Sequence, residues 1–192
     1  MKIITGEITR IEDYIESNGL TLIAGRPHVG KTTFALSQAK RMAMVFQIPV
    51  AFFSLEMTKW RLIEKLIPTT DNELKRLMEA PLYIDDTPNL SVSYLRNEVL
   101  RLAEVHGIKM VFVDYLQLMD TNDIVSSSCQ MKMSVCLHSL KELADNLGIS
   151  IIVICQTSRI MNGSDNSIEW RSNFRELDLC SLERDVKTIM LF

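Results

Sequence analysis

The sequence predicts an α/β fold in which a mostly parallel sheet is covered by helices on both faces. Short apolar runs alternate with helical stretches along the chain, a pattern typical of strands joined through helices. A glycine-rich loop stands between the first of these runs and the first helical stretch. The length of 192 residues, with 47% hydrophobic and 23% charged residues, fits one ordinary globular domain. We therefore expect a single domain over residues 1–192.

The expected strands are short apolar runs, because a strand buried on both faces is hydrophobic along its whole length. They are Leu20–Ala24, Val50–Leu55, Leu82–Ile84, Met110–Asp114, Ile149–Cys155 and Thr188–Phe192. Three segments between them lack internal glycine and proline and have helix-forming residues or plausible caps. These expected helices are Lys31–Met44, Ser91–His106 and Gln130–Asn146. Polar residues rich in Ser, Asn and Asp predict loops at Asp120–Ser128 and Met161–Asn173.

Composition also argues against several classes of protein. No apolar segment reaches the roughly 18–20 residues of a membrane helix, and the start lacks a signal-peptide core, so we expect a cytoplasmic protein. The net charge of −3 disfavours a monomer that grips nucleic acid through a broad basic face. The cysteines have no C-x-x-C spacing, so we interpret all four as reduced thiols: Cys129, Cys136, Cys155 and Cys180.

The glycine-rich loop Gly25–Thr32 matches the phosphate-binding pattern G-x-x-x-x-G-K-S/T between a strand and a helix. Its glycines would let backbone N–H groups point inward at the positive end of the helix dipole. Lys31 would contact the β- and γ-phosphates, and the Thr32 hydroxyl would coordinate Mg²⁺. For His28 a solvent-facing side chain is the favoured interpretation. The candidate nucleotide-binding residues are Gly25, Arg26, Pro27, His28, Val29, Gly30, Lys31, Thr32 and Thr33.

Polar residues also end three of the expected strands, where an open α/β sheet binds its ligands. Asp114 closes an apolar strand and is the candidate acid that orients Mg²⁺. Glu56 could be a general base that polarises the attacking water, or an ordinary helix-capping glutamate. Gln156 could hydrogen-bond the γ-phosphate, or be a simple surface residue of a turn. The residues alone leave the last two alternatives open.

Together these motifs resemble the ATPase domain of DnaB-type replicative DNA helicases. Beyond the phosphate-binding loop, the resemblance is carried by the phrases F-S-L-E-M at 53–57, D-Y-L-Q-L-M at 114–119, L-K-E-L-A at 140–144 and Q-T-S-R at 156–159. The segments 174–177 and 181–185 are similar to that family's D-L-R-E-S-G-S-I-E-Q-D stretch near the DNA-facing loops. The similarity runs from Thr5 to Phe192.

The resemblance implies a RecA-like P-loop fold that hydrolyses ATP with Mg²⁺ and forms hexameric rings on single-stranded DNA. It assigns Lys31 and Thr32 to phosphate and metal, Asp114 to the metal, Glu56 to general base catalysis and Gln156 to sensing the γ-phosphate. Basic residues near the polar loops are the candidate DNA contacts: Arg159, Arg171 and Arg175.

Departures from the family pattern leave two further hypotheses open. Asp120 stands where the family often has a basic residue, and Cys180 replaces a glycine. The family's amino-terminal domain and linker helix have no counterpart, and its arginine-finger strands would follow Phe192, so we expect this segment alone to hydrolyse ATP slowly. The alternatives to a helicase ATPase are a nucleotide-binding interaction module that has lost unwinding and another RecA-fold ATPase.

Overall fold

The computed structural model describes residues 2–5, 18–122, 124, 128–157, 182 and 184–192. Within them the chain forms one seven-stranded sheet in the order β1-β7-β2-β6-β5-β3-β4, with every neighbouring pair parallel. The strands are β1 Lys2–Thr5, β2 Gly19–Gly25, β3 Val50–Ser54, β4 Leu82–Asp85, β5 Met110–Asp114, β6 Ser150–Gln156 and β7 Thr188–Leu191. The expected parallel sheet is therefore confirmed.

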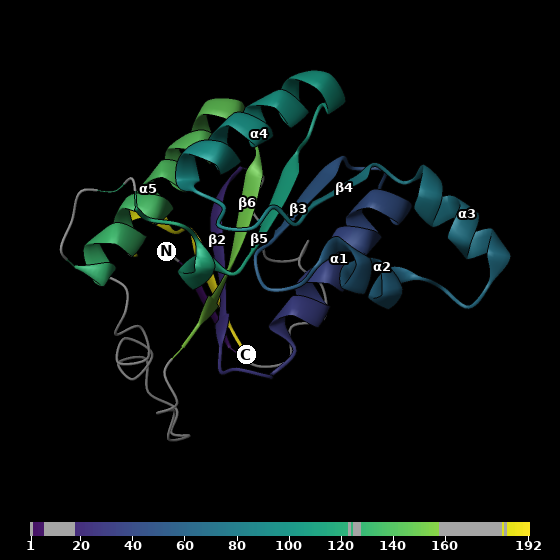
Figure 1. Ribbon diagram of the computed structural model, residues 1–192, viewed down its shortest axis with the longest axis horizontal. Helices are drawn as coiled ribbons and strands as arrows, with labels where there is room; N and C mark the ends of the chain where they lie inside the picture. Colours follow the sequence, from purple (N-terminus) through teal and green to yellow (C-terminus); the bar gives the residue numbers. More distant parts are fainter. Residues whose placement is uncertain (1, 6–17, 123, 125–127, 158–181, 183) are drawn as a thin grey trace.

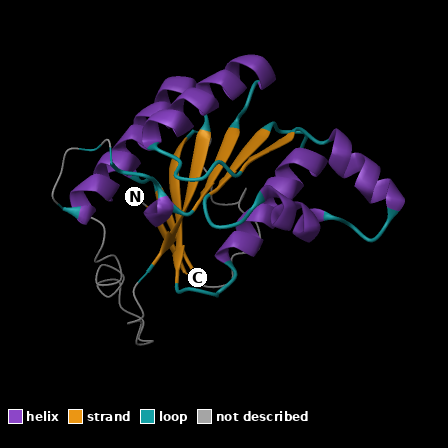
Figure 2. Ribbon diagram, in the orientation of Figure 1, coloured by secondary structure: helices purple, strands orange, loops and turns teal. Residues whose placement is uncertain are grey.

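Helices cover both faces of this sheet (Figure 1 and Figure 2). They are α1 Lys31–Val45, α2 Lys59–Leu66, α3 Asp71–Glu79, α4 Val92–His106 and α5 Cys129–Leu147, with a short 3-10 helix η1 at Leu116–Leu118. Helices α4 and α5 pack on one face and α1 and α2 on the other, each over its own hydrophobic cluster. The layers follow from parallel strands, whose connections must cross the sheet faces.

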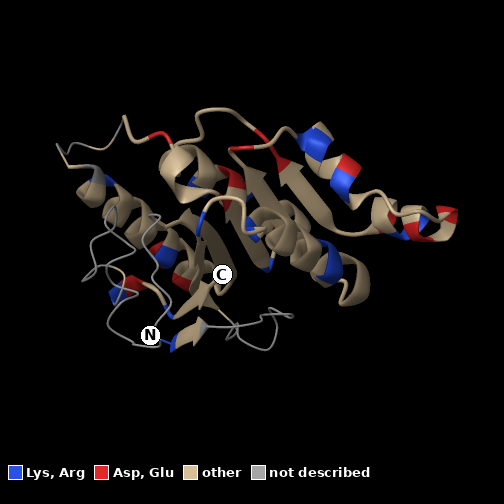
Figure 3. Ribbon diagram, turned by 90° about the horizontal axis from the view of Figure 1, so that it is seen from below, with Lys and Arg blue, Asp and Glu red and all other residues tan. Residues whose placement is uncertain are grey.

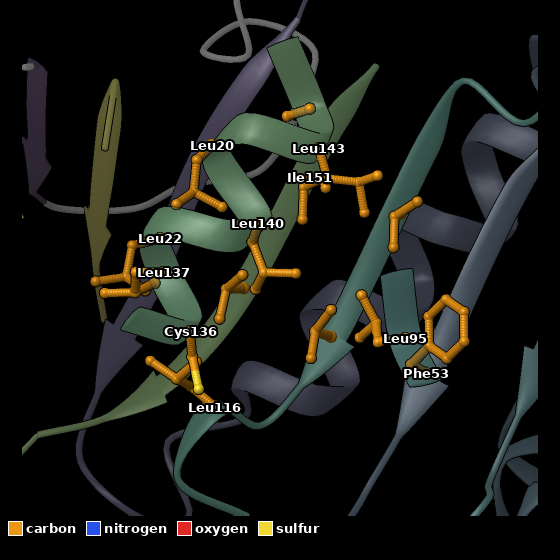
Figure 4. Packing of buried hydrophobic residues seen from close by; sticks show 14 of the residues in the cluster. Leu20, Leu22, Phe53, Leu95, Leu116, Cys136, Leu137, Leu140, Leu143 and Ile151 are labelled. Atoms are coloured by element: carbon orange, nitrogen blue, oxygen red, sulfur yellow. The ribbon is translucent and has the colours of Figure 1, made fainter. Parts of the chain in front are cut away.

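The central strands are buried on both faces, and their side chains divide between the two clusters. Leu20 and Leu22 point toward α5, where they meet Leu137 and Leu140 (Figure 4), while Ile23 between them belongs to the opposite cluster. This alternation is the two-residue period of an extended chain. Burial on both sides explains why the sequence shows unbroken apolar runs here.

The six expected strands and three expected helices are all present, with ends that shift by at most one residue. Strand β1, helices α2 and α3 and the short η1 were not predicted. Helix α3 has a recognisable start signal, because the Thr70 hydroxyl accepts a hydrogen bond from the Glu73 N–H at 3.4 Å. The expected loop Met161–Asn173 lies outside the described residues.

Two further expectations concern the membrane and the cysteines. In the part of the chain that the structure describes, no helix has both the length and the apolar character needed to cross a membrane. Cys136 and Cys155 are buried, and neither takes part in a disulfide among the described residues. The structure does not describe Cys180 or the side chain of Cys129.

Candidate nucleotide-binding site

The loop between β2 and α1 needs its two glycines for different reasons. A Cβ on Gly25 would lie 2.7 Å from the carbonyl oxygen of Phe192, so this glycine permits the close approach of the segment after β7. Gly30 has open space around it but adopts φ 92°, a left-handed conformation that side-chain-bearing residues rarely take. The first glycine therefore serves packing against the sheet, and the second serves the turn into α1.

The Lys31 side chain lies back against the loop that precedes it. Its ammonium donates hydrogen bonds to the carbonyl of Gly25 at 2.9 Å and to that of Arg26 at 2.6 Å. The residue is only 6% exposed, and this burial lowers the pKa of the ammonium group. Three nearby groups oppose the lowering of the pKa: Cys155, Asp114 and Glu56. The loop thus holds a positive charge at a fixed place beside two carboxylates.

Helix α1 offers its first N–H groups to the same place. Its N-cap is Gly30, which has no side chain that could accept hydrogen bonds from the first turn. Such free N–H groups at the positive end of a helix dipole bind anions, phosphates above all. His28 is exposed and in a left-handed conformation, consistent with the expected solvent-facing side chain.

Asp114 is a fully buried carboxylate at the end of β5. Neither of its oxygens has a hydrogen-bond partner within the described part of the chain. Its pKa is raised to about 6, chiefly by burial; the Thr32 hydroxyl and the Lys31 ammonium lower the pKa, and the charge of Glu56 adds to the rise. An unpartnered buried carboxylate is costly unless a cation or a donor satisfies it.

The residues around Asp114 fit a Mg²⁺ ion of the kind that nucleotides bring. Such an ion keeps several waters and takes one or two protein oxygens together with phosphate oxygens. Asp114 supplies two unpartnered oxygens, and the Thr32 hydroxyl is close enough to influence its pKa. The described residues contain no cluster of three or more metal-binding side chains, so a metal held by protein groups alone is not indicated there.

Glu56 follows β3, the strand next to Asp114. Ser54 pairs with Asp114 across the two strands, and the Leu55 N–H donates to the Asp114 carbonyl at 2.7 Å. The buried Ser54 hydroxyl donates to the Met57 carbonyl at 2.7 Å and accepts from its N–H at 3.1 Å. This pair of bonds holds the turn that carries Glu56. No local sequence pattern indicates this role for Ser54.

The position of Glu56 relative to α2 addresses the helix-capping alternative. Helix α2 begins at Lys59 with Thr58 as its N-cap, and it has no acidic residue in its first turn. Glu56 lies two residues before that cap and has an exposed side chain. Its charge acts on both Lys31 and Asp114. The geometry therefore favours the interpretation of Glu56 as a residue of the candidate site over its interpretation as a helix cap.

Gln156 is the last residue of β6, and it pairs with Gly25 of β2. Its side chain is half-buried. On the side away from β2, the backbone of Gln156 is bound by the side chain of Gln117, a residue of the D-Y-L-Q-L-M phrase. The arginines proposed to contact DNA lie outside the described residues: Arg159, Arg171 and Arg175.

The strand order brings these groups to one edge of the sheet. Strands β2, β6, β5 and β3 are consecutive neighbours and all parallel, so their carboxyl ends share that edge. Gly25, Gln156 and Asp114 end three of these strands, and Glu56 follows the fourth by two residues. Crevices beyond the carboxyl ends of parallel strands are where open α/β sheets bind their ligands.

Comparison with known proteins finds relatives that match most of this chain. A probable replicative DNA helicase of Trieres chinensis is 31% identical over 198 residues, which cover 92% of this chain and 43% of that protein. The replicative DNA helicase DnaB of Leifsonia xyli subsp. xyli is 31% identical over 206 residues, covering 96% of this chain and 44% of the relative. The chain thus spans less than half the length of these curated relatives.

A solved ATPase domain has the same fold and a related sequence. It superposes with a TM-score of 0.73 and 27% identity, over 92% of this chain and 70% of that chain. The family model for the DnaB-like helicase C-terminal domain matches residues 7–72 and 68–192. The expected family and the RecA-like fold are therefore confirmed, and the chain belongs to the DnaB-like helicase C-terminal domain family.

Proposed function

We propose that this chain is the ATPase domain of a replicative DNA helicase, in which ATP hydrolysis with Mg²⁺ drives movement on single-stranded DNA. The observation that carries the proposal is the meeting of the Lys31 ammonium, the unpartnered Asp114 carboxylate and the Glu56 carboxylate at one sheet edge. Membership of the helicase family supports the DNA part of the proposal. Assembly into a hexameric ring is the oligomeric state that we propose with it.

In the proposed reaction each described residue has a separate task. The loop N–H groups and the Lys31 ammonium bind the β- and γ-phosphates, and two carbonyl bonds keep that ammonium in place. Thr32 and Asp114 would hold Mg²⁺, which when bound neutralises charge that develops on the phosphates. Glu56 accepts a proton from the attacking water, and the Gln156 amide hydrogen-bonds the γ-phosphate. Catalysis of this type depends mainly on positioning and electrostatics.

Replacing Lys31 with alanine is expected to weaken ATP binding by roughly 10- to 150-fold, the equivalent of a hydrogen bond to a charged group. The physical reason is the loss of the buried cation beside the loop. Calorimetric titration with Mg·ATP measures the change, and Lys75→Ala, an exposed lysine of α3, is the matched control. Unchanged affinity in Lys31→Ala would place the nucleotide elsewhere.

Single-stranded DNA is expected to bind the monomer with a dissociation constant no tighter than micromolar, and strongly salt-dependent. If the proposed contacts Arg159, Arg171 and Arg175 neutralise three phosphates, the slope of log K against log salt is about −2. Fluorescence anisotropy at several salt concentrations measures it. Replacing the three arginines with alanine should flatten the slope.

The control for the DNA titration replaces three basic residues of α2 and α3, namely Arg61, Lys65 and Arg76, with alanine. These side chains are exposed. Basic and acidic positions alternate along the ribbons of the two helices (Figure 3). The control variant should therefore keep the slope of the parent chain. A sub-micromolar dissociation constant that does not change with salt concentration, measured on a confirmed monomer, would contradict the proposal.

A further inference from the structure

Strand β6 extends beyond its neighbour β5 at the edge where the site lies. The pairing of the two strands ends at Val113 and Val153, whereas β6 continues to Gln156. On its other side β6 stays paired with β2 as far as Gly25 and Gln156. Because β5 ends at Asp114, the last residues of β6 pair with no strand on that side within the described part of the chain.

The side chain of Gln117 takes the place of the missing strand. Its Nε2 donates to the carbonyl of Gln156 at 2.9 Å, and its Oε1 accepts from the N–H of Gln156 at 3.3 Å. The same Nε2 lies 3.1 Å from Sγ of Cys155. A primary amide carries both a donor and an acceptor, so it can bind one residue's N–H and C=O as a neighbouring strand would.

The turn that carries Gln117 is held in place by a buried neighbour, Leu116, and by backbone hydrogen bonds. Gln117 lies in η1, three residues after Asp114, and Leu116 beside it is fully buried. Figure 4 shows Leu116 next to Cys136 of α5, within the larger hydrophobic cluster. The N–H groups of Leu118 and Met119 bond back to the carbonyls of Tyr115 and Leu116. The turn after β5 is therefore fixed to the core, and through Gln117 it fixes the end of β6.

We propose that Gln117 is a positioning residue that sets the place of Gln156 at the γ-phosphate. The inference rests on the proposed function, in which the Gln156 amide contacts that phosphate. The Gln117 amide bonds to the N–H and the carbonyl of Gln156, so its proposed action is through that backbone. The turn that carries Gln117 directly follows Asp114, the proposed metal ligand. The hydrogen bonds of Gln117 to Gln156 therefore also connect the proposed metal ligand to the proposed γ-phosphate sensor.

Removing the Gln117 amide should lower the preference for a triphosphate over a diphosphate. The Gln156 side chain would then no longer be held in place to contact the γ-phosphate. The loss equals about one hydrogen bond, which lowers the affinity for the triphosphate about fivefold. ADP affinity should hold, because Gly25–Thr32 and Lys31 contact the phosphates that ADP also has. A merely structural role for Gln117 would instead lower the melting temperature and weaken both nucleotides alike.

The test is a double-mutant cycle on the ratio of ADP to AMP-PNP dissociation constants, measured by calorimetry with Mg²⁺ on the 192-residue chain. The variants are Gln117→Ala, Gln156→Ala and the double mutant, with Gln130→Ala, an exposed glutamine of α5, as the control. We expect each single variant to lower the preference for AMP-PNP about fivefold and the double mutant to lower it no further. Where Gln117→Ala does not fold, Gln117→Met, which keeps the length of the side chain, is judged by the same criteria.

The outcomes separate the inference from the function on which it rests. If Gln156→Ala leaves the preference for AMP-PNP over ADP unchanged, Gln156 is not the sensor. The proposed role of Gln117 is then overturned as well. If Gln156→Ala lowers the preference while Gln117→Ala does not, or if the two losses add, only the positioning role is overturned. Equal single losses that do not add support it.

Discussion

Glu56→Gln is expected to lower the turnover number for ATP hydrolysis by about 10²- to 10⁴-fold and to leave nucleotide affinity almost unchanged. The amide keeps the size of the side chain but cannot accept the proton of the attacking water. Affinity should hold because Glu56 is exposed at the rim of the site, while in the proposed complex the phosphates contact the loop and Lys31. The loss should therefore be confined to the chemical step.

The measurement pairs steady-state ATPase rates with calorimetric titrations. Rates should be followed over a wide range of protein concentration, because subunits of a ring can contribute to one another's sites. Glu64→Gln, an exposed glutamate of α2, is the matched control and should turn over like the parent chain. Parallel loss of binding and turnover in Glu56→Gln, or no loss of either, would count against a general base.

The sequence predicts those parts of the fold in which periodicity and burial agree. The central strands are recognisable because they are apolar along their whole length, and α4 because Ser91 and Gly107 cap its ends. Strand β1 was missed because only two of its four residues, Ile3 and Ile4, are apolar, and its place at the sheet edge depends on pairing with the distant β7. Helix α2 was missed because it is only eight residues long and has just two buried positions, Leu62 and Leu66.

Some residues of the candidate site can be predicted from the sequence, and others cannot. Residues whose chemistry depends on spacing, such as Lys31 and Thr32, are recognisable from the loop alone. Ser54 and Gln117 are not, because their roles depend on which backbone groups lie within hydrogen-bond distance, at 2.7 Å and 2.9 Å, after the chain has folded. For Gln117 the partner is 39 residues away in sequence. Contacts of this kind follow from strand length and register, which no local pattern specifies.

Asp114→Asn is expected to stabilise the nucleotide-free fold at neutral pH by about 3 kcal/mol while abolishing most of the benefit of Mg²⁺ for ATP binding. The pKa of Asp114 is about 6 in the folded chain, against an ordinary value of 3.8. A difference of about two units, at roughly 1.4 kcal/mol each, gives this magnitude. The asparagine removes the buried charge but keeps the shape of the side chain.

The sign of the pH dependence follows from that raised pKa. Because the folded chain binds the Asp114 proton more tightly than the unfolded chain does, the stability linked to this group is present in full below pH 3.8. It is lost as pH rises through the folded pKa of about 6. Asp185 acts in the opposite direction, since its bonds with Arg184 and His138 lower its pKa. The effect of Asp114 must therefore be read from the difference between the variant and the parent chain.

Urea unfolding of the two proteins between pH 4 and pH 8 measures this difference. We expect the two stabilities to lie close together near pH 4, to diverge as pH rises from about 4 to about 6, and to stay apart above that, with Asp114→Asn the more stable. Mg·ATP should then reverse the order, since a ligand that binds only the folded state stabilises it according to its affinity. Asp145→Asn, at an exposed position on α5, serves as the control. A stability difference that does not change with pH would show that the Asp114 carboxylate carries no burial penalty, and the argument that it is kept for a metal would fail.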